Sequence, residues 1–188
     1  RGFRNGRPML DSLCNDGFDV ICVQEHWLLP DNVNLFSNIS PNYAGFAVSG
    51  CCDIEQYAQR KGRPYGEVGI LWKQKSGIKC SILGLDDMHR CLAVKLECQQ
   101  DVIVCVNVYL PSFNNTTQYE EEILNCFAFI DSVFSQNIGS NVKFMMIGDF
   151  NFDLERLMNC DKLCTVKSLV EEYNLHLCDD LDCNKLGY

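Results

Sequence analysis

The sequence predicts a domain of mixed α and β structure, in which stacked β-sheets are flanked by helices. Short apolar runs typical of buried strands recur along the chain, and two long amphipathic helices are predicted among them. The length of 188 residues, 47% of them hydrophobic, favours one domain with a sizeable core. Periodicity alone leaves α/β and α+β architectures open.

In the first half of the chain the pattern predicts one short helix and four strands. The helix is predicted from Pro8 to Asn15, because proline suits a first turn and Met9, Leu10 and Leu13 share one face. Asp19–Gln24 follows an Asn-Asp-Gly turn and predicts a buried strand. Three further strands are predicted over Gly66–Trp72, Ile78–Leu83 and Arg90–Glu97.

The second half predicts two strands that alternate with two helices, and then a last short strand. Val102–Leu110 is almost continuously apolar and ends at Pro111, as a central strand should. Thr117 and Glu120 have the spacing of a capping box and open a helix with an apolar stripe. The remaining elements are predicted as a strand over Val142–Ile147, a helix over Val166–Tyr173 and a strand over Leu175–Cys178.

The charge is unevenly placed. Residues 1–100 carry 11 basic and 11 acidic side chains, whereas residues 101–188 carry 5 basic and 14 acidic ones. A net charge of −9 argues against a protein that coats nucleic acid non-specifically. The basic segment Gln59–Arg63 could touch phosphates, although a solvated loop is the simpler interpretation. No apolar run is long enough to predict a membrane span.

The 13 cysteines predict neither a zinc site nor a disulfide framework. Their number is odd, and no two of them have the C-x-x-C spacing. Cys22, Cys105 and Cys126 lie in apolar strand-like or helical runs, where a thiol acts as a small hydrophobe. We therefore expect reduced core thiols in an intracellular protein.

Polar side chains interrupt the ends of three predicted strands. Glu25 follows the first strand, where a carboxylate held by the backbone suits a hard cation, although a capping or salt-bridging role is also open. Tyr109 ends the central strand, where its hydroxyl could donate to an anionic oxygen or simply be buried. Gly148 allows a close approach of the backbone, and Asp149 and Asn151 after it share one side of the chain if the backbone stays extended, because side chains alternate with a period of two. The two residues could orient a water and a phosphate oxygen, or form an Asx-turn.

The order of these clusters resembles the endonuclease/exonuclease/phosphatase superfamily, and it is closest to the endonuclease domain of LINE-type (non-LTR) retrotransposons. The motifs are ICVQEHWL, YGEVGILW, HRCLAVKL, VNVYLP and MMIGDFNFD, and they span nearly the whole chain. The opening RGFRN resembles the end of the family's first motif, whose asparagine would precede Arg1.

The resemblance implies a four-layer sandwich and phosphodiester hydrolysis that depends on Mg²⁺, with Mn²⁺ as an alternative. It implies that Glu25 binds the metal, Asp149 orients or activates the attacking water, Asn151 holds that water and a phosphate oxygen, and Tyr109 contacts the scissile phosphate. Arg90 is interpreted as structural or as a distal DNA contact. Ser112, where relatives usually carry asparagine, is a second candidate substrate contact.

Two departures from the family pattern predict a domain, residues 1–188, that is incomplete at both ends. The first-strand asparagine and the terminal Ser-Asp-His segment are absent. His26 adjoins the metal motif, His89 lies in a predicted loop and His176 precedes the last strand, so none stands in the terminal position. Because losing a general acid or base costs about 10² to 10⁴ in rate, we expect little or no activity.

Three functions follow. The first is a DNA-nicking endonuclease whose parent polyprotein carries a reverse transcriptase. The second is an abasic-site nuclease or a phosphatase of the same superfamily, although the phosphatase motifs (Trp before Gly-Asp-x-Asn, and Arg-x-Pro-Ala-Trp) do not occur. The third is a catalytically dead remnant that binds nucleic acid. The sequence leaves the oligomeric state open.

Overall fold

The computed structural model describes residues 2–50, 67–112, 116–151 and 164–176. The chain divides into two compact units, residues 1–151 and residues 152–188. The basic segment Gln59–Arg63 lies outside the described residues.

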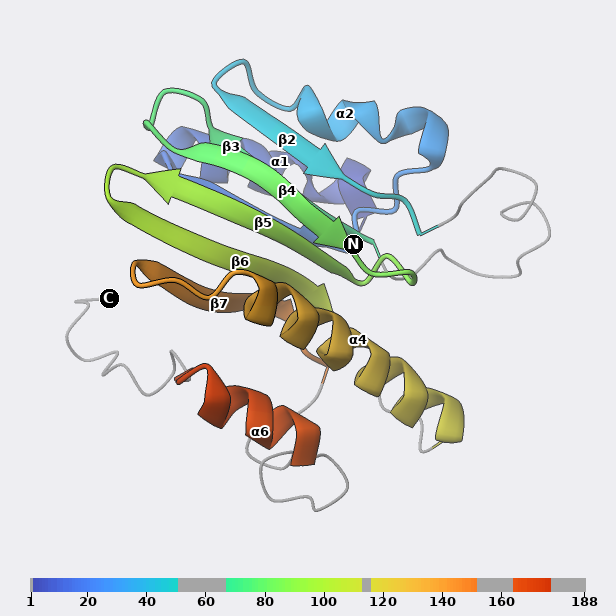
Figure 1. The fold of residues 1–188 in the computed structure, drawn as a ribbon. Helices are drawn as coiled ribbons and strands as arrows, with labels where there is room; N and C mark the ends of the chain where they lie inside the picture. Colours follow the sequence, from blue (N-terminus) through green and yellow to red (C-terminus); the bar gives the residue numbers. More distant parts are fainter. Residues whose placement is uncertain (1, 51–66, 113–115, 152–163, 177–188) are drawn as a thin grey trace, which may run out of the picture. The chain divides into compact units, whose positions relative to one another are not determined.

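The first unit contains two β-sheets (Figure 1). The smaller sheet has the order β1-β3-β2, and both pairings are antiparallel. Its strands are β1 (Val20–Gln24), β2 (Tyr43–Ala47) and β3 (Val68–Lys73). The sequence predicted β1 and β3 but missed β2, because its run Tyr-Ala-Gly-Phe-Ala is short and contains glycine and two alanines.

The larger sheet has the order β4-β5-β6-β7. Its strands are β4 (Lys79–Leu85), β5 (Cys91–Cys98), β6 (Asp101–Tyr109) and β7 (Val142–Asp149), each close to a predicted strand. β6 and β7 are parallel and are joined through the helix α4 (Thr117–Gln136), whereas the other pairs are antiparallel hairpins. Only this sheet is therefore mixed.

The two sheets stack face to face around a shared core. Leu92, Val94 and Leu96 of β5, which the alternation predicted on one face, pack in the same cluster as Val68 and Ile70 of β3. β6 lies inside the larger sheet and is buried on both faces, which explains its almost continuous apolar sequence.

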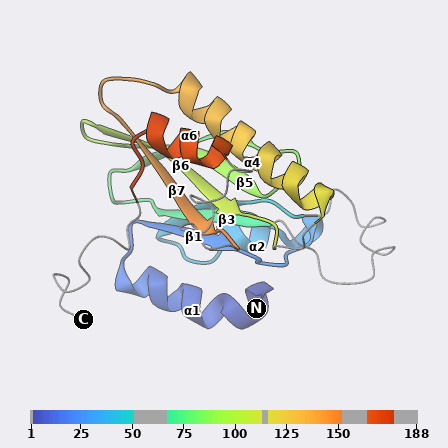
Figure 2. The same cartoon turned by 90° about the horizontal axis from the view of Figure 1, so that it is seen from below.

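Helices cover the outer faces of both sheets, as Figure 2 shows. The helix α1 (Gly2–Asp16) buries Phe3 and Leu10 against the smaller sheet, in a cluster that includes Phe36 of the short helix α2 (Asn34–Ser37). A 3₁₀ turn at Pro30–Asn32 precedes α2. The helix α4 packs on the larger sheet, and the rings of Phe134 and Phe144 lie 4.6 Å apart. The predicted four-layer sandwich is thus confirmed.

Two helix starts differ from the prediction. α1 begins at Gly2 rather than Pro8, because burial of Phe3 extends the helix through the proline. At α4 the N-cap is Thr116 rather than Thr117: its side chain accepts a hydrogen bond from Tyr119 N at 3.2 Å, so Glu120 is not the capping-box partner.

The second unit contributes the helix α6 (Cys164–Glu172), which corresponds to the predicted helix. Leu175 and His176 are not in a strand, and the rest of the predicted Leu175–Cys178 segment lies outside the described residues. Within the described part of the chain, no helix combines the length and apolarity needed to cross a bilayer.

Candidate active site

Glu25 and Tyr109, which are 84 residues apart in sequence, meet at one edge of the stacked sheets. The Tyr109 hydroxyl donates a hydrogen bond of 2.5 Å to Glu25 Oε1. Burial, followed by this hydrogen bond and the Glu25 charge, raises the pKa of Tyr109 above its usual range. Tyr109 is therefore a hydroxyl donor at every pH at which the protein would work.

Asp149 lies beside Tyr109, because the two residues are register partners in the parallel β6–β7 pair. Leu110 N donates to Asp149 O at 2.9 Å, just beyond that pair. Gly148 has φ of 146°, and a Cβ there would lie 1.9 Å from Val108 O. Only glycine lets β7 approach β6 closely enough to place Asp149 at the site, as the sequence predicted.

Asn151 does not continue an extended backbone, so the period-two argument for its orientation is wrong. The strand ends at Asp149, and Asn151 has φ of 53°. Its backbone N–H donates to Asp149 Oδ1 at 3.0 Å, which is the Asx-turn alternative, and its side-chain Nδ2 donates to Leu110 O at 2.7 Å. The turn brings the Asn151 amide back to the end of β6.

Asn107 joins the two sheets below the site. It is buried, and its Nδ2 donates to Gly69 O at 2.9 Å and to Val23 O at 3.2 Å. Gln24 Nε2 donates to Asn107 Oδ1 at 2.6 Å. Asn107 has no predicted role from the sequence, although an amide inside an apolar strand is a visible signal.

Arg90 is buried behind Tyr109. Its guanidinium carbon lies 5.8 Å from the Tyr109 ring centroid, and Nη2 pairs with Glu122 Oε2 of α4 at 3.3 Å. Arg90 is 4% exposed and packs against Tyr109, which agrees with a structural role for this arginine. Ser112 is exposed next to the site edge, and its contact with substrate stays a prediction.

His26 is buried between the sheet and α2, and it is not exposed to substrate. Its Nε2 donates to Val48 O at 2.9 Å, and its Nδ1 accepts from Leu28 N at 3.1 Å. Burial lowers the pKa of His26 to about 4. His26 is therefore a buried and neutral residue at physiological pH.

The backbone around His26 is strained. Glu25 and Trp27 have φ of 54° and 55°, in the left-handed region that costs a non-glycine residue about 1–2 kcal/mol. Trp27 N donates to the carboxylate of Glu67, and Glu25 N donates to Glu67 O at 3.0 Å. Burial raises the pKa of Glu67 to about 7. Sequence reasoning missed Glu67, although a charge at the start of an apolar strand was a signal.

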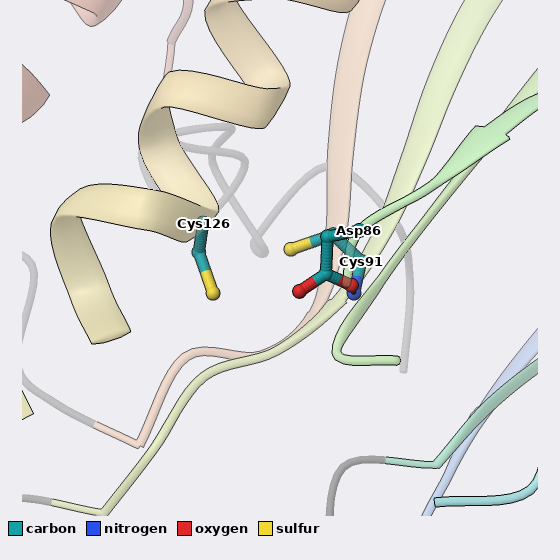
Figure 3. A group of neighbouring side chains, drawn as sticks. All are labelled: Asp86, Cys91 and Cys126. Carbon is teal, nitrogen blue, oxygen red and sulfur yellow. Dashed lines mark hydrogen bonds between the residues drawn. The ribbon is translucent and has the colours of Figure 1, made fainter. Parts of the chain in front are cut away.

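A second polar cluster holds Asp86, Cys91 and Cys126, whose ligand atoms lie within 4.8 Å of one another (Figure 3). Both carboxylate oxygens of Asp86 already accept hydrogen bonds from backbone N–H groups. Oδ1 accepts from Arg90 N and Cys91 N, and Oδ2 accepts from Met88 N. The hydrogen bond to Cys126, together with burial, raises the pKa of Cys91 well above its usual range. The cluster is therefore a packed turn in which the Cys91 thiol stays protonated.

The donor set at the Glu25 edge fits a hard divalent cation. Within the described part of the chain, Glu25 Oε2 and Asp149 Oδ2 make no hydrogen bond, so each carboxylate keeps an oxygen for a ligand. No group of three acidic, histidine or cysteine ligands forms here among the described residues. Mg²⁺ needs only one or two protein carboxylates, because it keeps several of its waters.

No protein-family model matches the chain, and no curated protein matches it. Solved structures do match. An AP endonuclease from Leishmania major is 15% identical with a TM-score of 0.59, over 92% of this chain and 62% of that one. Sphingomyelinase C from Streptomyces griseocarneus is 16% identical with a TM-score of 0.56, over 93% and 65%. The endonuclease domain of TRAS1, a telomere-specific non-LTR retrotransposon, is 11% identical with a TM-score of 0.54, over 94% and 69%.

These matches show that the chain has the fold of the endonuclease/exonuclease/phosphatase superfamily. The chain spans less than two thirds of the Leishmania and Streptomyces proteins. Two of these proteins are named as endonucleases and one as a sphingomyelinase, so the fold by itself selects no substrate.

Proposed function

We propose that this chain is a metal-dependent DNA-nicking endonuclease of a LINE-type retroelement. The observation that carries the proposal is the hydrogen bond between Tyr109 and Glu25 at a sheet edge that also presents Asp149 and Asn151. An acid, a phenol and an amide from three separate segments converge there. Such convergence at strand ends is typical of an active site rather than of a packed core.

Glu25 would hold the metal, with Asp149 as the second available carboxylate. When bound, Mg²⁺ polarises a phosphoryl oxygen and neutralises charge that builds up during cleavage. The single O–H of Tyr109, which donates to Glu25 Oε1, would turn to a phosphate oxygen when Glu25 holds the metal.

Asp149 and Asn151 would position the attacking water. Asp149 Oδ2 offers an acceptor for a water proton, while Oδ1 stays fixed by the Asn151 backbone. The Asn151 side chain spends one N–H on Leu110 O and keeps a second N–H and its carbonyl oxygen. These groups can bind one water and one phosphate oxygen.

We propose that turnover by this chain is slow. Neither His26 nor His89 makes a hydrogen bond or ion pair with Tyr109, Asp149 or Asn151. A missing general acid or base lowers the rate by about 10² to 10⁴. DNA as substrate, an intracellular location and a parent polyprotein with a reverse transcriptase complete the proposal.

The test is nicking of supercoiled plasmid with Mg²⁺ or Mn²⁺. We expect slow nicking that Glu25→Ala lowers at least tenfold and that Tyr109→Phe lowers less. Asp101→Asn is the matched control, because Asp101 is an exposed carboxylate paired with Lys143 at the far end of β6. Equal rates for the wild type and Glu25→Ala would contradict the proposal.

Two further arms separate the alternatives. An oligonucleotide with one abasic site, cleaved much faster than the intact duplex, would favour an abasic-site nuclease. Mn²⁺ binding that Glu25→Gln abolishes, without cleavage of either DNA, would favour a catalytically dead remnant that still binds metal.

A further inference from the structure

The turn that carries Glu25 is held by a residue from another strand. Glu67 precedes β3 and accepts two hydrogen bonds from this turn, one at its main-chain oxygen from Glu25 N and one at its carboxylate from Trp27 N. These donors belong to Glu25 and Trp27, the residues of this turn that have a left-handed backbone. Glu67 thus fixes both strained positions, one through its main-chain oxygen and the other through its carboxylate.

Glu67 is itself immobilised. It is fully buried, and the next residue, Val68, pairs with Gln24 in the β1–β3 register. The far side of the turn is fixed by His26, which bonds Val48 O and Leu28 N. Glu67 Oε2 lies 3.7 Å from His26 Nδ1, so the carboxylate and the ring pack as one unit.

We propose that Glu67 is a positioning residue for Glu25: it locks the left-handed turn that turns the Glu25 carboxylate toward Tyr109. The inference rests on the proposed function, in which Glu25 holds the metal. Strained backbone persists only where the surroundings over-determine it, and it concentrates at functional sites. Groups that orient a ligand residue typically change metal affinity 10- to 100-fold when removed.

The role requires an oxygen acceptor at the end of a glutamate-length side chain, and it does not require a charge. Glu67→Gln keeps the length and an acceptor for Trp27 N, so it should bind Mn²⁺ within threefold of the wild type. Glu67→Asp keeps the charge but cannot reach, so it should lose affinity at least tenfold, as should Glu67→Ala.

Two measurements on the 188-residue protein test this. One is the Mn²⁺ dissociation constant, from the electron paramagnetic resonance signal of free Mn²⁺. The other is the hydrogen-exchange rate of the Trp27 amide by NMR without metal, which should rise at least tenfold in Glu67→Asp and stay near the wild-type value in Glu67→Gln. Ile130→Ala is the control for general destabilisation, because Ile130 is buried on α4, away from this turn.

The proposal would be overturned if Mn²⁺ affinity were retained in Glu67→Asp and lost in Glu67→Gln. It would also be overturned if Ile130→Ala lost as much Mn²⁺ affinity as Glu67→Asp. The exchange rate needs no metal, so it separates this inference from the proposed function. If Glu25→Ala binds Mn²⁺ normally, the proposed function fails, whereas unchanged Trp27 exchange in Glu67→Asp contradicts the positioning role.

Discussion

Two buried carboxylates in this protein hold backbone turns, and they differ in where their partners lie in the sequence. Asp86 accepts N–H groups from Met88, Arg90 and Cys91, all within five residues. Glu67 accepts the N–H of Trp27, forty residues away. Burial raises the pKa of both groups.

The position of the hydrogen-bond partners determines how each turn takes its shape. The Asp86 turn closes on itself and holds Arg90 behind Tyr109. The Glu25–Leu28 turn takes its shape only when β1 and β3 pair, because its partner belongs to another strand. A local turn can order before the sheets assemble, whereas a turn held from another strand cannot.

The largest expected effect is at the local turn. Asp86→Ala leaves two buried N–H groups, those of Arg90 and Cys91, without an acceptor, at about 1–3 kcal/mol each. We expect a loss of about 4 kcal/mol in the free energy of unfolding, measured by urea titration. Asp86→Asn retains one acceptor oxygen and should lose less than half as much; equal losses in the two variants would refute this account.

The second prediction concerns the two titrating groups at the Glu25–Leu28 turn, His26 and Glu67. Folding lowers the pKa of His26 to about 4, so its contribution to stability is present above pH 6.5 and is lost as the pH falls toward 4. Folding raises the pKa of Glu67 to about 7, so its contribution is present below pH 4.5 and is lost as the pH rises through 7. Between pH 4.5 and 6.5 the two groups change the free energy of unfolding with pH in opposite directions, and the two changes cancel.

Glu67→Gln removes the pH dependence of stability that Glu67 contributes and leaves that of His26. The variant should lose about 3 kcal/mol of stability relative to the wild type between pH 6.5 and 4.5, since one pKa unit corresponds to about 1.4 kcal/mol. Urea titrations of both proteins, metal-free and at three pH values, measure the difference. Parallel pH profiles for the wild type and Glu67→Gln would show that His26 and Glu67 do not titrate as described.

The smallest effect is expected at another local contact. Thr116→Ala removes the acceptor for Tyr119 N at the start of α4 and should cost about 1 kcal/mol. Thr117→Ala is the matched control one residue later and should cost less. If Thr117→Ala lowered the Tm more than Thr116→Ala, Thr117 rather than Thr116 would be the N-cap.

The fold was largely predictable because its strands carry strong local signals. β5 alternates cleanly, β6 is apolar on both faces and stops before Pro111, and β1 follows the sequence Asn-Asp-Gly, which is typical of a turn although Asn15 and Asp16 end the helix α1. β2 and the start of α1 were missed, since burial against the neighbouring layer, rather than local propensity, forms them.

The candidate site was predictable as a set of residues but not as an arrangement. The sequence placed Glu25, Tyr109 and Asp149 at strand ends, where the structure has them. It left an extended backbone and an Asx-turn open for Asn151, of which the structure has the Asx-turn, and it assigned no role to Asn107 or Glu67.

Local sequence signals were enough to predict most strands and helices and the polar residues that stand at strand ends, because periodicity, turn residues and residue type act over a few neighbouring positions. Tertiary structure alone decided three things: that Tyr109 meets Glu25, that Arg90 and His26 are buried rather than exposed to substrate, and that Glu67 holds the turn of Glu25. Each depends on two strands paired or stacked from distant parts of the chain. Such contacts form only when burial of the shared core offsets the entropy of ordering those parts together.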